Sequence, residues 1–124
     1  MKTSKDYLEE ANKVVKKIEM NDALEKHKNN SAIFIDVRDS SDIAETGTIT
    51  GALKIQRGLI EFVADDSHGL HNKALKKDSE IILVCGASGQ AALTGKTLID
   101  MGYSNVSNVG AIGDWGNKGG PMTK

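Results

Sequence analysis

The stretch IILVCGASGQAALTGKTL, residues 81–98, joins a short apolar run to a helix-forming run through a loop of small side chains. The four aliphatic residues Ile81–Val84 are typical of a strand that is buried on both faces. A helix is predicted from Gln90 to Met101, with Gly102 as its C-terminal cap. Cys85, the single cysteine of the chain, follows the strand directly. The stretch therefore predicts a strand, a tight loop and a helix, with a thiol at the carboxyl end of the strand.

The rest of the chain repeats this alternation of short apolar runs and helical patterns. The run AIFIDV is apolar and β-branched enough for a buried strand, and two further short strands are predicted. The three strands cover residues 32–37, 52–55 and 105–109. Helices are predicted over 7–18, from Asn21 onward, over 58–64 and over 111–116. Residues 39–51 are predicted as one helical turn followed by a loop, and 65–78 as a mostly polar loop. This order predicts one α/β domain over residues 1–124 with a mostly parallel sheet, and residues 1–17 as an N-terminal helical extension.

Composition and charge exclude several classes of function. The formal net charge of -1 gives no electrostatic reason to expect nucleic acid or an anionic membrane as a partner. A single cysteine forms no internal disulfide, and no group of Cys and His residues has the spacing of a zinc site. No apolar run resembles a signal peptide or reaches the length of a membrane span. We therefore expect a cytoplasmic protein without a metal.

The setting of Cys85 suggests a functional thiol. In open α/β sheets, ligands bind beyond the carboxyl ends of the strands, and Cys85 is predicted at such an end. The loop Gly86-Ala87-Ser88-Gly89 is small enough to curl its N–H groups inward, next to a helix N-terminus. Such a cradle stabilises an anion: a thiolate, a persulfide sulfur or the oxygens of an oxyanion. From these residues alone the alternative is a structural, buried cysteine in a tight turn.

Several motifs in this order resemble those of a known family, the single-domain rhodanese-like sulfurtransferases. The likeness covers roughly residues 18–122. Its opening part is FIDVRDSSDIAETGTITGAL at 34–53, similar to the family's "DVR…E…GHIPGA" signature, followed by IQRGLIEF at 55–62. The active-site loop, its helix, the next strand and a terminal turn correspond to VCGASGQAALTGKTLIDMGYSNVSNVGAIGDW at 84–115.

The resemblance implies a rhodanese-like α/β fold with a mostly parallel five-stranded sheet flanked by helices. It also implies sulfur transfer. Cys85 would take a sulfane sulfur from thiosulfate or a protein persulfide, hold it as a persulfide, and pass it to an external thiol or to cyanide. The backbone of Gly86, Ala87, Ser88, Gly89 and Gln90 would form the cradle, and Asp36 and Arg38 would be a supporting pair. No metal or organic cofactor is expected.

Departures from the family pattern concern the charge of the loop. Active relatives usually carry Arg where this chain has Gln90, and the chain contains only two arginines, Arg38 and Arg57. A bidentate guanidinium is the best side-chain receptor for the oxygens of thiosulfate, so efficient use of thiosulfate is in question. Arg57 is a candidate for the missing cation; the alternative is an exposed Arg57 paired with Glu61. Thr48 and Thr50 stand in place of the family's His and Pro, which is interpreted as a structural change.

Two other functions compete with sulfur transfer. Related cysteine phosphatases need an Arg six positions after the Cys, but this chain has Ala91 there, and Val84 precedes the Cys instead of His. A low-turnover sulfur carrier or regulatory binding module of the same fold is favoured by Gln90 and disfavoured by the retained Cys85 and the intact loop.

Overall fold

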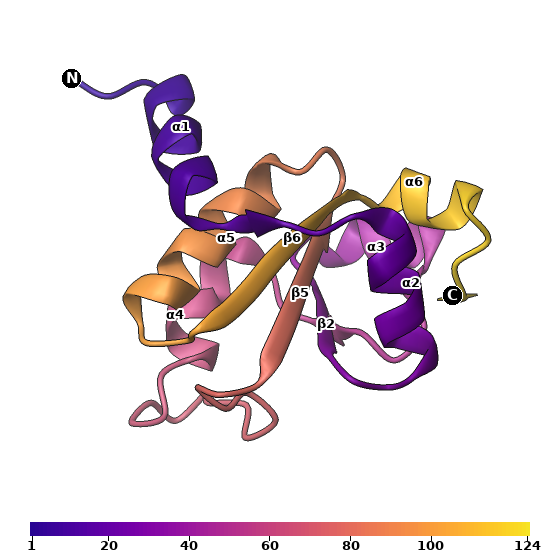
Figure 1. Ribbon diagram of the computed structural model, residues 1–124. Coiled ribbons are helices and arrows are strands. Elements are labelled where there is room, and N and C mark those ends of the chain that lie inside the picture. The colour runs from indigo at the N-terminus through magenta and orange to yellow at the C-terminus, as the bar shows by residue number, and fades with distance from the viewer.

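Five parallel strands form a central sheet in the computed structural model, which describes residues 1–124 (Figure 1). The spatial order is β1-β6-β5-β2-β4, so the central strand is the one that ends in Cys85. A second, two-stranded antiparallel sheet pairs β3 with β7. The bounds are β1 Lys16–Lys17, β2 Ile33–Asp36, β3 Thr48–Ile49, β4 Leu53–Lys54, β5 Glu80–Cys85, β6 Asn105–Ala111 and β7 Met122–Thr123. The predicted α/β class with a mostly parallel five-stranded sheet is confirmed.

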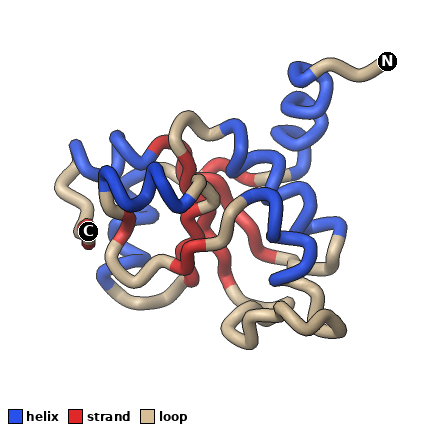
Figure 2. The backbone as a smooth tube through the Cα atoms, turned by 180° about the vertical axis from the view of Figure 1, so that it is seen from behind, coloured by secondary structure: helices blue, strands red, loops and turns tan.

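Helices cover both faces of the sheet (Figure 2). Their bounds are α1 Ser4–Val14, α2 Met20–Lys28, α3 Ser40–Thr46, α4 Ile60–Val63, α5 Gly89–Asp100 and α6 Ile112–Asn117, with a 3₁₀ turn η1 at Arg57–Leu59. One apolar cluster lies between the sheet and α4 and α5, and the other between the sheet and α2 and α6. None of these helices is long and apolar enough to cross a membrane.

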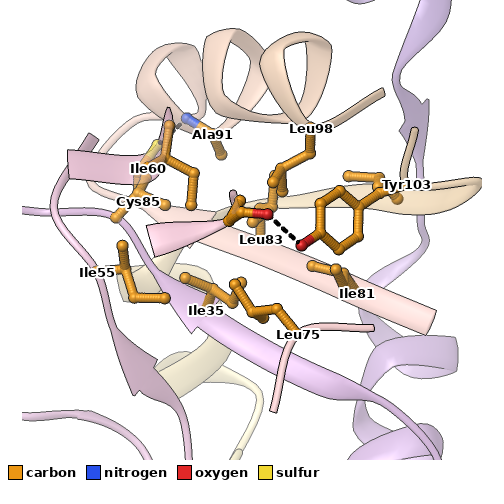
Figure 3. Packing of buried hydrophobic residues seen from close by; sticks show 13 residues of the cluster. Ile35, Ile55, Ile60, Leu75, Ile81, Leu83, Cys85, Ala91, Leu98 and Tyr103 are labelled. Atoms are coloured by element: carbon orange, nitrogen blue, oxygen red, sulfur yellow. Dashed lines mark hydrogen bonds between the residues drawn. The ribbon is translucent and has the colours of Figure 1, made fainter. Parts of the chain in front are cut away.

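Strand β5 divides its side chains between the two clusters. Ile81, Leu83 and Cys85 belong to the cluster under α4 and α5, which Figure 3 shows from close by. Ile82 and Val84 belong to the opposite cluster. Because both faces are covered, the strand is a continuous apolar run, as the sequence predicted. The alternation directs the Cys85 thiol toward the N-terminal end of α5.

The N-terminal segment differs from the predicted helical extension over residues 1–17. Helix α1 ends at Val14, and Lys16–Lys17 forms the edge strand β1 beside β6. The backbone at Val15 is extended, and its buried side chain meets Gly95 of α5, so a longer helix would carry this contact away from the core. Helix α2 correspondingly begins at Met20, one residue before the predicted N-cap.

The segment 39–51, predicted as one helical turn and then a loop, contains the seven-residue helix α3, and the small sheet β3–β7 replaces part of the predicted loop. Thr48 and Ile49 pair with Thr123 and Met122 of the C-terminal segment. Ile49 is fully buried, which explains why this short pairing forms. Two-residue strands that pair across most of the chain leave no local periodicity to detect.

Candidate active site

The sulfur of Cys85 is held by two backbone N–H groups. Cys85 is the last residue of β5, and only the loop Gly86–Ser88, here named the Cys85 loop, separates it from α5. The Ser88 N–H donates to Sγ at 2.9 Å and the Ala91 N–H at 3.4 Å. The residue is 1% exposed, and Figure 3 shows it at one end of the apolar cluster, beside Ala91 and Ile60.

The turn of the Cys85 loop is made at Ser88. Its φ of 80° lies in the left-handed region, which is costly for a residue with a side chain. Gly86 and Gly89, the residues best suited to that conformation, do not adopt a positive φ. The carbonyl of Ser88 accepts the Ala92 N–H and so begins α5. Backbone strain of this kind clusters at functional sites.

Asn108 anchors this strained residue from the neighbouring strand. Strands β5 and β6 change register where Leu83 pairs with Asn108 but Val84 pairs with Gly110, a bulge that leaves one extra residue in β6. The buried Asn108 amide donates to the Ser88 carbonyl at 3.1 Å, and its Oδ1 accepts the Gly110 N–H at 2.8 Å. Sequence reasoning missed Asn108 and Ala91. The signal for Asn108 was a buried amide within the strand predicted over 105–109.

Asp36 and Arg38 form a buried ion pair at the end of β2, next to β5. The guanidinium contacts the carboxylate through Nε and Nη2, at 2.8 Å for the shortest bond, and also donates to Thr46 Oγ1 and the Gly47 carbonyl. Thr48, which stands in place of the family's His, donates its hydroxyl to Asp36 at 2.7 Å. These bonds tie β2 to the segment after α3, and β2 aligns Asp36 with Val84 on β5.

The candidate substrate-binding side chains carry no free charge toward the loop. Both carboxylate oxygens of Glu61 lie 3.3 Å from Nη1 of Arg57, and Nη2 donates to Thr97 of α5 at 3.3 Å. Gln90 is exposed in the first turn of α5. Neither arginine donates a hydrogen bond to the Cys85 loop. A ligand that approaches position 90 therefore meets the neutral amide of Gln90.

Fewer N–H groups of residues 86–90 contact the Cys85 sulfur than the sequence predicted. Within it, the Ser88 N–H is the group that reaches the sulfur, and Ala91, just outside it, supplies the second donor. Gly86 and Ala87 are exposed at the turn. Gly89 begins α5 and has Leu8 of α1 close by. The structure therefore brings backbone groups, and no charged side chain, onto the sulfur.

Comparisons with known proteins agree with this fold. A model of the rhodanese-like domain matches residues 19–118. A solved protein of unknown function from Rhodopseudomonas palustris, described as a possible tyrosine phosphatase, is 29% identical with a TM-score of 0.93, covering 99% of this chain and 96% of its own. The polysulfide-sulfur transferase of Wolinella succinogenes is 24% identical with a TM-score of 0.75, covering 96% and 85%. The human single-domain sulfurtransferase TSTD1 is 20% identical with a TM-score of 0.71, covering 82% and 96%. No curated protein sequence matches this chain. With the family model spanning strands β2 to β6, the Cys85 loop and α5, the chain belongs to the rhodanese-like domain family.

Proposed function

We propose that this chain is a sulfurtransferase that carries a sulfane sulfur on Cys85. The observation that carries the proposal is the pair of N–H groups from Ser88 and Ala91 on Sγ, at the carboxyl end of the central strand. A thiolate there is a nucleophile, and the same donors remain in place when the sulfur becomes part of a persulfide.

The transfer has two balanced steps. The Cys85 thiolate attacks the terminal sulfur of the donor, an S–S bond forms, and the donor leaves with the electron pair of its own bond to that sulfur. With thiosulfate the leaving group is sulfite; with a persulfide it is a thiolate. An external thiolate then attacks the outer sulfur, the electron pair returns to Sγ, and the acceptor leaves as a persulfide. No further oxidant or cofactor is required.

The surroundings of Cys85 favour donors with a small terminal sulfur. At 1% exposure, the thiol offers little surface, which favours a donor that ends in a single small atom. Thiosulfate meets that requirement but brings two negative charges, for which the neutral Gln90 amide is a poor receptor. A persulfide or polysulfide delivers its terminal sulfur without an attached sulfonate. We therefore expect persulfide-type donors to be used better than thiosulfate, unless Arg57 leaves Glu61 to bind the anion.

Phosphate-ester hydrolysis is a second candidate, because the R. palustris relative is described as a possible tyrosine phosphatase. It needs a guanidinium around the transferred phosphoryl group. Position 91 holds a fully buried alanine, Arg38 is bonded to Asp36, and Arg57 is bonded to Glu61. The tetrahedral phosphorus of an ester is also harder to reach at this buried thiol than a terminal sulfur. Sulfur transfer is therefore the better-supported function.

Intact-protein mass spectrometry tests the proposal. After exposure to polysulfide, the protein is expected to gain the mass of one sulfur atom and to lose it when a thiol is added. Cys85→Ser should gain none while keeping its circular dichroism spectrum, since a hydroxyl of nearly the same size is not ionised at neutral pH. The same preparation should release no phosphate from an aryl phosphate.

The measurement also separates an enzyme from a low-turnover carrier module. An enzyme passes many sulfur atoms per Cys85 to excess thiol, whereas a carrier releases one and reloads slowly. A sulfur adduct that forms equally on Cys85→Ser, or on neither protein, would contradict the role given to Cys85.

A further inference from the structure

A cavity of about 230 Å³, here named the Arg38 cavity, lies at the carboxyl ends of β2 and β4. Its lining comes from the residues at these strand ends, from helix α3 and from the C-terminal segment that holds β7. No residue of the Cys85 loop lines it, so the cavity is separate from the thiol. Its volume is below the roughly 300–1,000 Å³ of sites for drug-sized ligands, so a fitting ligand is a small molecule.

The charged side chains that line the Arg38 cavity are all positive. They are Arg38, Lys54 and Lys124, and no carboxylate side chain lines the cavity, not even from α3. Arg38 is paired with Asp36, but both lysines are exposed and neither takes part in an ion pair of the protein. Two uncompensated ammonium groups at one small cavity favour a ligand with two negative charges.

The buried guanidinium of Arg38 has one hydrogen-bond donor without an acceptor. A guanidinium carries five N–H groups. The Nε group and one Nη2 group donate to Asp36, the other Nη2 group donates to Gly47, and one Nη1 group donates to Thr46. The second Nη1 group has no acceptor within the protein, and Arg38 is only 5% exposed. Because an unpaired buried donor is costly, a ligand oxygen in the cavity would stabilise this group.

Neutral donors and a small apolar surface complete the lining. Ser40 and Gln56 bring a hydroxyl and an amide, both of which can donate to an oxyanion. Guanidinium and ammonium groups together suit a phosphate, which presents more acceptor oxygens and a larger charge than a carboxylate. Ile43 and Ala44 of α3 can contact a short carbon chain attached to that phosphate.

We propose that the Arg38 cavity binds a dianionic phosphate group, carried by inorganic phosphate or by a small phosphate monoester. Binding needs neither the Cys85 thiol nor a sulfur on it, so this inference does not depend on the proposed function. The ligand connects the end of β2 with Lys54 of β4 and with Lys124 after β7. It should therefore stabilise the β3–β7 pairing and raise the melting temperature with increasing ligand concentration.

Direct binding to the full chain tests the site. The first probe is inorganic phosphate, titrated at constant ionic strength and followed by NMR. Saturable amide shifts are expected at Ser40, Gln56 and Thr123. A variant combining Lys54→Gln with Lys124→Gln should bind roughly two- to thirtyfold more weakly, as expected for the loss of two charge contacts from exposed lysines.

A matched control removes two lysines elsewhere. Lys13 and Lys28 are also exposed, take part in no ion pair and lie outside the cavity lining. Lys13→Gln with Lys28→Gln should leave the affinity for phosphate unchanged. Equal weakening in the two double variants would overturn the proposal, as would an absence of saturable shifts. Shifts confined to Ser88 and Ala91 would place the anion at the Cys85 loop and would also overturn it.

A second probe, n-propyl phosphate, distinguishes the two sources of the phosphate group. If one CH₂ group is buried against Ile43, the ester should bind roughly fourfold more tightly than inorganic phosphate. Equal affinities would assign the site to inorganic phosphate itself.

Melting temperatures provide a readout that does not rely on chemical shifts. Phosphate also stabilises proteins in general because it is excluded from their surface. Specific binding therefore requires that the rise with phosphate be larger in the wild type and in the Lys13→Gln, Lys28→Gln control than in the Lys54→Gln, Lys124→Gln variant. An equal rise in all three proteins would overturn the proposed site.

Discussion

The Asp36–Arg38 pair and the Cys85 loop lie at the ends of neighbouring strands, but side chains make the contacts in the first and backbone N–H groups make them in the second. The pair is a network of buried side chains, in which Arg38 and Thr48 both donate to the Asp36 carboxylate. The loop surrounds its sulfur with the backbone N–H groups of Ser88 and Ala91 and with no charged side chain.

The difference indicates that the Asp36–Arg38 network serves the stability of the fold, whereas the Cys85 loop serves reactivity. In the network each charge is neutralised by a particular side chain, so a change there leaves a buried group without its partner. In the loop the donors are backbone groups, which remain when a side chain is exchanged. Under the proposed function, an exposed side chain such as Gln90 would set the choice of donor without altering the fold. The predictions below test this division, beginning with the largest expected effect.

Arg38→Met should lower the free energy of unfolding by about 3–5 kcal/mol, because the buried Asp36 carboxylate loses its counter-ion. Urea denaturation measures this, and a shifted midpoint with an unchanged m-value would indicate a change in stability alone. Arg57→Met is the matched control. Its ion pair with Glu61 is partly exposed, so its loss should cost under about 1 kcal/mol. Equal, small losses in both variants would mean that the network does not stabilise the fold.

Gln90→Arg should raise kcat/KM for thiosulfate by roughly ten- to a hundredfold, the effect of one charge-assisted bidentate contact of about 1.5–3 kcal/mol. Gln90 is exposed, so an arginine fits there without repacking. With polysulfide as donor, the gain should be much smaller. Steady-state rates with both donors test the prediction.

Two further variants sharpen the Gln90 result. Gln90→Met keeps the size of the side chain without any charge and should not improve thiosulfate use. Arg57→Ala in the Gln90→Arg background shows whether Arg57 already binds the anion, since a large further loss would assign it that role. A rise that is equal for both donors would indicate a general effect on the loop and would contradict the charge argument.

Asn108→Ala should destabilise the protein by about 1–2 kcal/mol, because the Gly110 N–H loses its acceptor and Ser88 loses its anchor. Sulfur transfer should fall as well, since the Ser88 N–H is no longer held against Sγ. Asn105→Ala on the same strand is the control; its amide oxygen accepts only from the exposed Lys16, so it should cost under about 0.5 kcal/mol. Equal unfolding midpoints and equal transfer rates in the two variants would contradict the role given to Asn108 in the site.

Sequence patterns predicted those elements whose signal is local. The aliphatic run at 81–84, the helix after it and Gly102 at the helix end are recognisable because burial on both strand faces and the period of a helix act over a few residues. The position of Cys85 at a strand end followed from the same stretch. Residues 16–17 were predicted wrongly as helix, because a two-residue edge strand is stabilised by β6 and not by its own side chains.

By itself, the sequence determined the order of the helices and of strands β2, β4, β5 and β6, the single thiol and the absence of an arginine after it. Only the tertiary structure decided which backbone groups reach that thiol. The Ala91 N–H does so because α5 begins at Gly89, and Ser88 is held in its left-handed conformation by Asn108 through a bulge between β5 and β6. Likewise, segments from opposite ends of the chain, with Lys17 and Lys118, line a common groove at the edge of the sheet. Such contacts depend on strand register and long-range packing, for which no local pattern of residues carries a signal.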